Sequence, residues 1–345
     1  MKVVAVGDVF ITPEMMRKSF EKYEEFDECQ YFFFGQNTRR KMRGTVKTIE
    51  LGGRDKCKLP DGYLEAVKDA EVLMVHLCPV TEKVLKHAKK LKYILCNRGG
   101  IENIDADAAR DRHIKILFNP AHNANAVAEF TIGTMFCELR NIARSHMAIK
   151  SGDWREKYPN SGRIIELRNL TVGIVGFGNV GELVCEKLSG FGCNILVSNL
   201  FQPECTNPRI NWKKVQFVEL DELITRSDII SLHARSKSKE PLFGKREFEM
   251  MKKTAIFINT ARSYMVDCDA LYNALNKQLI EGAAIDVFEV EPLGPDHPFL
   301  SLDNITLTNH RGGDTVNAYS DSPDMMLSEL IGLLHDGKEP KYLIQ

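Results

Sequence analysis

The sequence predicts an α/β protein built from two doubly wound domains, each with a mainly parallel sheet. Short apolar runs with the length of buried strands alternate with helical patterns through most of the 345 residues. Polar residues follow several of these runs directly, at the strand ends where doubly wound sheets bind their ligands. A glycine-rich turn joins one strand to one helix in the second half. Together these observations predict two α/β halves, of which the second is the stronger candidate for binding a nucleotide.

The first half, up to Asn119-Pro120, alternates strands and helices as βαβ units do. Strands are expected at Lys2–Val6, Tyr31–Phe34, Val72–Leu77, Tyr93–Cys96 and Ile114–Phe118, and helices at Pro13–Tyr23, Asp61–Ala70, Glu82–Lys90 and Ala106–Arg112. Asp105 is placed to cap the last of these helices. The segment Asn37–Pro60 fits the alternation poorly, because a basic run, several glycines and the apolar stretch Val46–Leu51 follow one another there. We expect an excursion that contains a β element, and we interpret its charges as a solvated face.

The second half begins with a long helical pattern over Asn123–Lys150, and the polar segment Ser151–Arg168 is typical of a connecting arm. Further strands are expected at Val172–Val175, Ile195–Ser198, Phe217–Val218, Ile229–Leu232, Ala255–Asn259, Gly282–Asp286 and Ile305–Leu307. The helices between them are expected at Asn179–Leu188, Leu220–Arg226, Lys245–Met251 and Asp267–Asn276, and a last helix at Ala318–His335. This order again predicts a parallel sheet.

The composition excludes several classes of protein. Apolar residues make up 43% and charged residues 27% of the chain, as in globular proteins with a large core. The net charge of −1 gives no reason to expect nucleic acid or an anionic membrane as a partner. The nine cysteines form no C-x-x-C pair and the nine histidines no ligand-spaced cluster with them, so we expect free thiols and no metal. No apolar segment has the length of a signal peptide or a membrane span. We therefore expect a cytoplasmic protein.

Gly176, Gly178 and Gly181 follow a strand and open a helix with the spacing G-x-G-x-x-G. In a dinucleotide-binding turn the first glycine permits the tight turn, the second lets the backbone approach the pyrophosphate, and the third lets helix and strand pack closely. The helix N-terminus then presents unpaired N–H groups to the anion. The alternative interpretation is a glycine-rich turn without a ligand. The flanking strand and helix favour dinucleotide binding.

Arg262, Glu291 and His310 each follow an expected strand of the second half. These strands are Ala255–Asn259, Gly282–Asp286 and Ile305–Leu307, respectively. Taken singly, each residue has an ordinary structural explanation. Arg262 could cap a helix C-terminus or form a surface ion pair, Glu291 could be a solvated carboxylate, and His310 could be a core histidine. Because parallel strands end at the same edge of a sheet, we expect the three side chains to gather beside the glycine-rich turn.

The motifs G-F-G-N-V-G, I-N-T-A-R-S, A-A-I-D-V-F-E-V-E-P-L and T-N-H-R-G-G together resemble those of the D-isomer-specific 2-hydroxyacid dehydrogenase family. Asn103-Ile104-Asp105 and the segment Asn123–Glu129 extend the resemblance, which is dense from about Leu95 to Gly313 and thin before that. It implies a Rossmann cofactor domain at residues 121–311, inserted in a flavodoxin-like substrate domain made of residues 1–120 and 312–345. Catalysis would sit in a cleft with hinges near Asn119-Pro120 and Gly312-Gly313. The segment Asn123–Arg168 resembles the family's dimerisation element, which implies a homodimer.

The resemblance also implies roles for single residues. Arg262 would bind the carboxylate of a 2-keto acid and polarise its ketone, because a guanidinium fork matches both oxygens. His310 would protonate the ketone oxygen during reduction, and Glu291 would stabilise its imidazolium form. Backbone N–H groups of Arg98, Gly99 and Gly100 would meet the substrate carboxylate. The residues implied to contact the cofactor are Gly176, Phe177, Gly178, Asn179, Val180, Gly181, Asn199, His233, Ala234, Thr260, Ala261, Asp286 and Gly312, with Asp286 at the nicotinamide carboxamide.

The sequence departs from the family's pattern at three positions. Asn199 stands where an acid normally binds the adenine ribose, and an amide does not repel a 2′-phosphate. No arginine pair follows Asn199, so NAD is favoured while NADP stays open. Arg235 and Asn309 stand where the family usually has proline, and neither change removes a catalytic group.

Other members of the same fold offer rival interpretations. One is a nicotinamide-sensing protein that resembles transcriptional corepressors, against which the intact Arg262, Glu291 and His310 argue. Another is a formate dehydrogenase, which carries glutamine at the position of Glu291. Arginines that phosphoglycerate-type members carry near His76–Pro79 are absent, which disfavours a phosphorylated substrate. The sequence does not name the acyl group of the 2-hydroxy acid.

Overall fold

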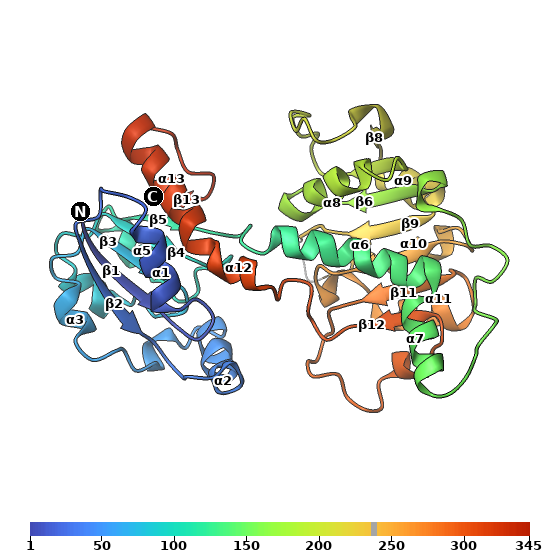
Figure 1. The fold of residues 1–345 in the computed structure, drawn as a ribbon, viewed down its shortest axis with the longest axis horizontal. Helices are drawn as coiled ribbons and strands as arrows, with labels where there is room; N and C mark the ends of the chain where they lie inside the picture. Colours follow the sequence, from blue (N-terminus) through green and yellow to red (C-terminus); the bar gives the residue numbers. More distant parts are fainter. Residues whose placement is uncertain (236–239) are drawn as a thin grey trace. The chain divides into compact units, whose positions relative to one another are not determined.

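The computed structural model of the protein describes residues 1–235 and 240–345, and the chain divides into two compact units (Figure 1). Unit 1 comprises Met1–Asn123 together with Thr315–Gln345, and unit 2 comprises Ala124–Asp314. In Figure 1 unit 1 therefore carries the blue of the N-terminal segment and the red of the C-terminal segment. Unit 2 is an insertion into the chain of unit 1.

Unit 1 is a sheet with helices on both faces. Its strands are β1 (Lys2–Gly7), β2 (Glu28–Phe33), β3 (Val72–Val75), β4 (Tyr93–Cys96), β5 (Lys115–Phe118) and β13 (Leu343–Ile344). Its helices are α1 (Pro13–Phe20), α2 (Arg39–Glu50), α3 (Tyr63–Ala66), α4 (Glu82–His87), α5 (Ala106–Arg110), α12 (Val316–Ser320) and α13 (Ser322–Asp336). The strand order is β13-β5-β4-β3-β1-β2, with β1 to β5 parallel and β13 antiparallel to β5. The order 2-1-3-4-5 of the parallel strands is the flavodoxin-like one, as the resemblance implied.

Unit 2 carries a second parallel sheet. Its strands are β6 (Thr171–Val175), β7 (Asn194–Ser198), β8 (Val215–Phe217), β9 (Ile229–Leu232), β10 (Ile256–Asn259), β11 (Gly282–Ile285) and β12 (Ile305–Leu307). Its helices are α6 (Ala124–Arg140), α7 (Ile142–Lys150), α8 (Asn179–Ser189), α9 (Leu220–Arg226), α10 (Lys245–Met250) and α11 (Cys268–Asn276). The order β12-β11-β10-β9-β6-β7-β8 places β6 and β9 side by side. From this pair the sheet continues through β7 and β8 on one side and through β10, β11 and β12 on the other. Ligands of open α/β sheets bind at such a switch point.

Both sheets are buried on both faces, which explains why the strands are almost continuously apolar. In unit 1, Val4 and Val6 of β1 pack into one core, while Val3 and Ala5 pack into the core on the other face. Unit 2 likewise has one core on each face of its sheet. Within residues 1–235 and 240–345, no helix combines the length and the apolar character needed to cross a bilayer.

The expectation of a β element in Asn37–Pro60 is wrong, because residues 39–50 form the helix α2. Thr38 caps this helix by accepting a hydrogen bond from the Lys41 N–H group. The apolar stretch Val46–Leu51 had favoured a strand. However, Met42 and Ile49 are buried and lie seven positions apart, which is the spacing of one helical face. Burial of that face against the core decides the structure.

Two of the expected helices are each divided into two, and a third is reduced to one short turn. The long helix expected over Asn123–Lys150 breaks at Asn141, which has φ = 53° and separates α6 from α7. A buried network holds this break: Asn141 accepts from Arg144 Nη1 at 3.3 Å and donates to Asn160 Oδ1 at 2.6 Å. The C-terminal helix is divided at Asp321 into α12 and α13, and the helix expected over Asp61–Ala70 is reduced to α3. Strand β13 was not predicted, because a two-residue strand has no periodic signal.

Candidate active site

The glycine-rich turn connects β6 to α8 and is shaped by close backbone contacts. Gly176 has φ = 93°, and an added Cβ would lie 2.6 Å from the backbone of Ala234. At Gly181 an added Cβ would overlap the Gly176 carbonyl oxygen. At Gly178 the same atom would meet nothing within 4 Å. Two of the glycines are therefore needed for the turn itself, whereas Gly178 borders open space in front of α8.

The N-terminus of α8 faces that open space without a side-chain cap. The first-turn N–H groups of a helix have no partner within the helix, and together with the helix dipole they favour an anion. Phe177, Asn179 and Val180 lie in this turn, as the motif predicted. The arrangement can therefore hold a pyrophosphate against the backbone.

Asn199 lies directly after β7 and is bonded to the same turn. Its Oδ1 atom accepts a hydrogen bond from the Phe177 N–H group at 3.1 Å, and its Nδ2 atom donates to the Phe201 carbonyl oxygen at 2.8 Å. The end of the second strand is thereby fixed to the glycine-rich turn. One Nδ2 hydrogen of Asn199 has no described protein partner and can serve a ligand hydroxyl.

His233 and Ala234 follow β9, across the switch point from the glycine-rich turn. The His233 N–H group donates to the Val175 carbonyl oxygen at 2.8 Å, and its Nε2 atom lies 2.9 Å from Ser231 Oγ. Burial lowers the pKa of His233 to about 3, so the ring is neutral at physiological pH. The backbone of Ala234 lies against Gly176. The two loops thus pack on each other where the sheet reverses its order.

The loop after β10 is held by the last residue of that strand. Asn259 accepts a hydrogen bond from the Ala261 N–H group at 3.0 Å and donates to the Arg262 carbonyl oxygen at 3.1 Å. Thr260 Oγ1 lies 2.8 Å from Thr131 Oγ1 on α6, and this contact is buried. The Arg262 side chain is exposed and donates from Nη1 to the Ala261 carbonyl oxygen at 2.7 Å. Its remaining N–H groups make no hydrogen bond to the described residues and are available to an anionic ligand.

Glu291 and His310 come from the loops after β11 and β12, and the structure brings their side chains together. The two Glu291 oxygens lie 2.8 and 3.1 Å from His310 Nδ1, and Glu291 Oε1 also accepts from the Phe288 N–H group at 3.0 Å. The carboxylate therefore fixes the ring through Nδ1 and leaves Nε2 on the opposite edge. In the neutral ring this arrangement puts the proton on Nδ1 and makes Nε2 the basic atom.

Asp286, directly after β11, is buried and lies beside the loop that carries His310. Its carboxylate accepts hydrogen bonds from the Arg311 and Gly312 N–H groups, each at 2.9 Å. Since β10, β11 and β12 are neighbours in the sheet, their three loops end at one edge. Arg262, Asp286, Glu291 and His310 all lie on these loops, as the sequence predicted.

The loop Arg98–Gly100 belongs to unit 1 and follows β4. Arg98 Nη2 lies 3.4 Å from Glu50 and 3.3 Å from Glu102, while Nη1 is buried without a hydrogen-bond partner. An added Cβ on Gly99 would lie 3.3 Å from Pro120 Cα, so the loop packs closely on the next strand end. Its N–H groups lie at the ligand-binding edge of this sheet.

Sequence reasoning missed a buried pair at the switch point of unit 1. Asp8 follows β1 and His76 follows β3, and Asp8 Oδ2 lies 2.8 Å from His76 Nδ1. Asp8 also accepts hydrogen bonds from the Phe10 N–H group at 2.8 Å and the Leu77 N–H group at 3.2 Å. Polar residues at the ends of β1 and β3 were the available signal, but the strand order that makes them neighbours is a tertiary property.

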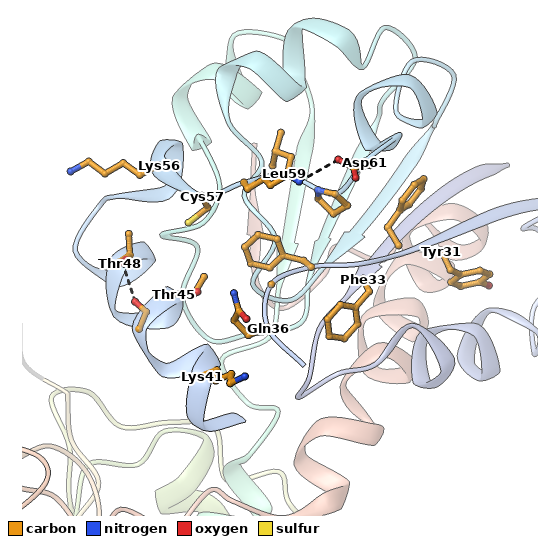
Figure 2. Close-up of a pocket in the computed structure, with 16 residues that line it drawn as sticks. Tyr31, Phe33, Gln36, Lys41, Thr45, Thr48, Lys56, Cys57, Leu59 and Asp61 are labelled. Atoms are coloured by element: carbon orange, nitrogen blue, oxygen red, sulfur yellow. Dashed lines mark hydrogen bonds and ion pairs between the residues drawn. The ribbon is translucent and has the colours of Figure 1, made fainter. Parts of the chain in front are cut away.

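Unit 1 also contains a hollow, which is lined by other residues (Figure 2). Its volume is about 1020 Å³, and its lining comes from β2, α2 and residues 56–61. In Figure 2 the Lys56 side chain points away from the hollow, and Thr48 donates to the Gly44 carbonyl oxygen at 3.0 Å. Its described lining includes no residue predicted for catalysis, cofactor or substrate. The part of the chain that the structure describes also holds no group of three or more His, Cys, Asp or Glu residues that could bind a metal.

Comparison with known proteins identifies the family. Residues 132–312 match the family model of the D-isomer specific 2-hydroxyacid dehydrogenase, NAD binding domain. The D-3-phosphoglycerate dehydrogenase of Methanocaldococcus jannaschii is 37% identical over 257 residues, which are 74% of this chain and 48% of that protein. The glyoxylate reductase of Thermofilum pendens is 34% identical over 290 residues, which are 81% of this chain and 83% of that protein. This chain thus spans about half the length of the first relative and most of the second.

A solved structure confirms the predicted fold class. It is the NAD complexed form of a D-isomer specific 2-hydroxyacid dehydrogenase from Lactobacillus delbrueckii ssp. bulgaricus. Its TM-score is 0.74 at 21% identity, with 100% of both chains covered. The fold, the glycine-rich turn and the matched sequence therefore agree: this chain belongs to the D-isomer specific 2-hydroxyacid dehydrogenase family, and residues 132–312 correspond to its NAD-binding domain.

Proposed function

We propose that the protein is an NAD-dependent oxidoreductase that interconverts a 2-keto acid and the corresponding D-2-hydroxy acid. The observation that carries this proposal is the hydrogen bond between Glu291 and His310, at an edge shared with Arg262 and the glycine-rich turn. A titratable ring, a carboxylate that orients it and a guanidinium with unused donors are the groups that ketone reduction needs. Unit 2 is proposed as the cofactor domain and unit 1 as the substrate domain.

The residues of unit 2 fit a nicotinamide dinucleotide. The open space at Gly178 and the uncapped α8 would hold the pyrophosphate, and Asn199 would bond a ribose hydroxyl. Thr260 and Ala261 would lie at the nicotinamide end, as the resemblance implies. When bound, the reduced cofactor supplies the hydride that reduces the ketone carbon. Asn199 carries no charge that would repel a 2′-phosphate, so we propose NAD as the main cofactor with weak discrimination against NADP.

The acid–base step is proposed for His310 and Glu291. In reduction the imidazolium donates its Nε2 proton to the ketone oxygen, where negative charge develops as the hydride arrives. The proton on Nδ1 stays in the hydrogen bond to Glu291, and that carboxylate is itself held by the Phe288 N–H group. In oxidation the neutral ring accepts the hydroxyl proton at Nε2. Glu291 thus keeps one tautomer and one ring orientation in both directions.

The substrate carboxylate is proposed to bind Arg262, whose guanidinium keeps unused donors. Charge-assisted hydrogen bonds from a guanidinium are about twice as strong as neutral ones, and the fork geometry matches two substrate oxygens. This recognition needs a carboxylate beside a ketone and little else. A small 2-keto acid without a phosphate is therefore the substrate class we propose.

A second copy of this chain is the proposed partner. Ile142, Met147, Trp154, Ile164 and Ile165 are exposed on α7 and the arm that follows it. Exposed apolar residues gathered on one segment mark an interaction surface. The nine cysteines are unpaired, which supports our proposal that the protein works in a reducing compartment such as the cytoplasm.

The proposal is tested by measuring NADH oxidation across a panel of small 2-keto acids. We expect turnover with at least one of them and none in His310→Gln, while NADH binding, followed by fluorescence titration, stays the same in both. Binding of NADH by the wild type without turnover of any keto acid would contradict the proposal. It would favour the corepressor-like interpretation instead.

A further inference from the structure

The Asp286 side chain accepts three hydrogen bonds from the loop that carries His310. Its Oδ1 atom accepts from the Thr308 hydroxyl at 2.7 Å and from the Arg311 N–H group at 2.9 Å. Its Oδ2 atom accepts from the Gly312 N–H group at 2.9 Å. Asp286 is only 2% exposed, so water does not compete effectively for these bonds. The carboxylate therefore contacts the residues on both sides of His310.

The backbone of His310 needs such support, because it has φ = 56°. This left-handed conformation is uncommon for residues with a Cβ atom and persists where the surroundings enforce it. The peptide unit after His310 is planar, so the direction of the Arg311 N–H group is set by the His310 backbone. The bond from Arg311 to Asp286 consequently fixes that peptide, and the Gly312 bond fixes the next one.

Two carboxylates that follow β11 thus hold His310, one through its ring and one through the backbone next to it. Glu291 binds the ring at Nδ1, and Asp286 binds the backbone that carries the ring. Both residues follow β11, while His310 follows the neighbouring strand β12. Because the ring and the backbone are both tethered, the direction of Nε2 is determined.

We propose that Asp286 is a positioning residue for the acid–base step: its carboxylate holds His310 in the left-handed conformation that directs Nε2 at the reacting oxygen. This inference rests on the proposed function and deepens it. It differs from the role that the resemblance implies, in which Asp286 contacts the nicotinamide carboxamide. The two roles predict different kinetic consequences for the same substitution.

A carboxylate suits this role better than an amide. In Asp286→Asn the amide oxygen can replace Oδ1 and keep the bonds from Thr308 and Arg311. The NH₂ group then faces the Gly312 N–H group, so two donors meet and that bond is lost. Gly312→Ala disturbs the same bond from the other side, because its Cβ would lie 3.1 Å from Asp286 Oδ2. Thr308→Val is the matched control, since it removes a bond to Oδ1 and leaves both backbone bonds in place.

The test compares wild type, Asp286→Asn, Gly312→Ala and Thr308→Val with one good keto acid. For each variant we would measure kcat, the solvent deuterium isotope effect on kcat, and the NADH dissociation constant. A misplaced acid should lower kcat in Asp286→Asn by on the order of 10²-fold, because catalysis is steeply sensitive to displacements near 1 Å. The isotope effect should rise, since proton transfer becomes slower, while NADH affinity stays unchanged. Gly312→Ala should show the same changes in milder form, and Thr308→Val should behave like wild type.

Two results would overturn the inference. Weakened NADH binding in Asp286→Asn with an unchanged solvent isotope effect would assign the residue to the carboxamide. Equal losses in Thr308→Val and Asp286→Asn would show that the loop needs general packing and no specific backbone bond. If Asp286→Asn does not fold, Gly312→Ala still decides, because an unchanged isotope effect there contradicts the proposal. A wild type that reduces no keto acid refutes the proposed function instead, so the two failures are distinct.

Discussion

Single glycine-to-alanine substitutions separate the structural glycines of the turn from the one expected to face the cofactor. At Gly181 an added Cβ would overlap the Gly176 carbonyl oxygen and lie 3.1 Å from its carbon, and both atoms are backbone. Ordinary C···O contacts are no closer than about 3.3 Å, so α8 would have to retreat from the turn by roughly 1 Å. Overpacking of this kind destabilises by about 1–3 kcal/mol. The helical preference of alanine over glycine offsets up to about 1 kcal/mol of that.

Gly178→Ala should weaken NADH binding without lowering the stability of the protein. Its backbone conformation, with φ = −92°, is open to alanine, and its Cβ would meet nothing within 4 Å. We therefore expect unchanged thermal unfolding, but a loss of NADH affinity, because the methyl group would occupy the space of the pyrophosphate. Gly44→Ala is the control. It lies in the middle of α2 in the other unit with nothing within 4 Å, and it should gain up to about 1 kcal/mol without a change in binding.

The assay pairs thermal unfolding with NADH titration for the three variants. The expected pattern is lower stability and weaker binding for Gly181→Ala, weaker binding alone for Gly178→Ala, and neither loss for Gly44→Ala. Wild-type affinity in Gly178→Ala would refute the placement of the pyrophosphate. Unchanged stability in Gly181→Ala would refute the close approach of α8 to the turn.

Four further predictions follow from individual side chains. Arg262→Lys keeps the charge but loses the fork, so kcat/KM should fall on the order of 10²-fold at unchanged NADH affinity, and wild-type turnover would remove Arg262 from the site. Asn199→Asp should raise the ratio of NADH to NADPH kcat/KM, since a carboxylate repels the 2′-phosphate, and an unchanged ratio would place Asn199 away from the ribose. Glu291→Gln keeps the size of the side chain but loses the carboxylate that orients the His310 ring, so kcat should fall at unchanged NADH affinity; a wild-type kcat would disprove the pairing. Burial lowers the pKa of His233 to about 3, against about 6.5 in an unfolded chain, so the unfolded state binds more protons between these values. The free energy of unfolding from denaturant titrations should therefore fall as pH drops from about 6.5 to about 3. In His233→Gln this free energy should depend less on pH. An equally steep dependence in the variant would contradict the buried neutral ring.

Local patterns were sufficient to predict the features that depend on neighbouring residues in the chain. The glycine spacing predicted the turn at Gly176–Gly181 because its geometry is set within one strand–turn–helix unit. The position of His310 after an apolar run likewise predicted its place at the sheet edge. The strand expected at Val46–Leu51 was wrong because a short apolar stretch suits a strand and a helix alike. Burial of Met42 and Ile49 on one helical face decides between them, and only the folded core reveals it.

Contacts between distant strand ends could not be predicted from the sequence. Asp8 and His76 are 68 positions apart and meet because β1 and β3 are neighbours in the sheet. The bonds of Asp286 to Arg311 and Gly312 depend on the register of β11 against β12 and on the left-handed backbone of His310. Asn199 could be placed at a strand end from the sequence. Its bond to the Phe177 N–H group required the fold of the turn.

The most direct test of the central claim is the identity and configuration of the product formed from one equivalent of NADH. The purified protein is incubated with each 2-keto acid of the panel, and the 2-hydroxy acid is resolved by chiral chromatography alongside a His310→Gln sample with matched NADH occupancy. We expect one molecule of the D-2-hydroxy acid for each NADH oxidised by the wild type, and no product from His310→Gln. Formation of the L-isomer would contradict the proposed D-specificity. Equal product from His310→Gln would contradict the assignment of His310, and with it Glu291, to the acid–base step.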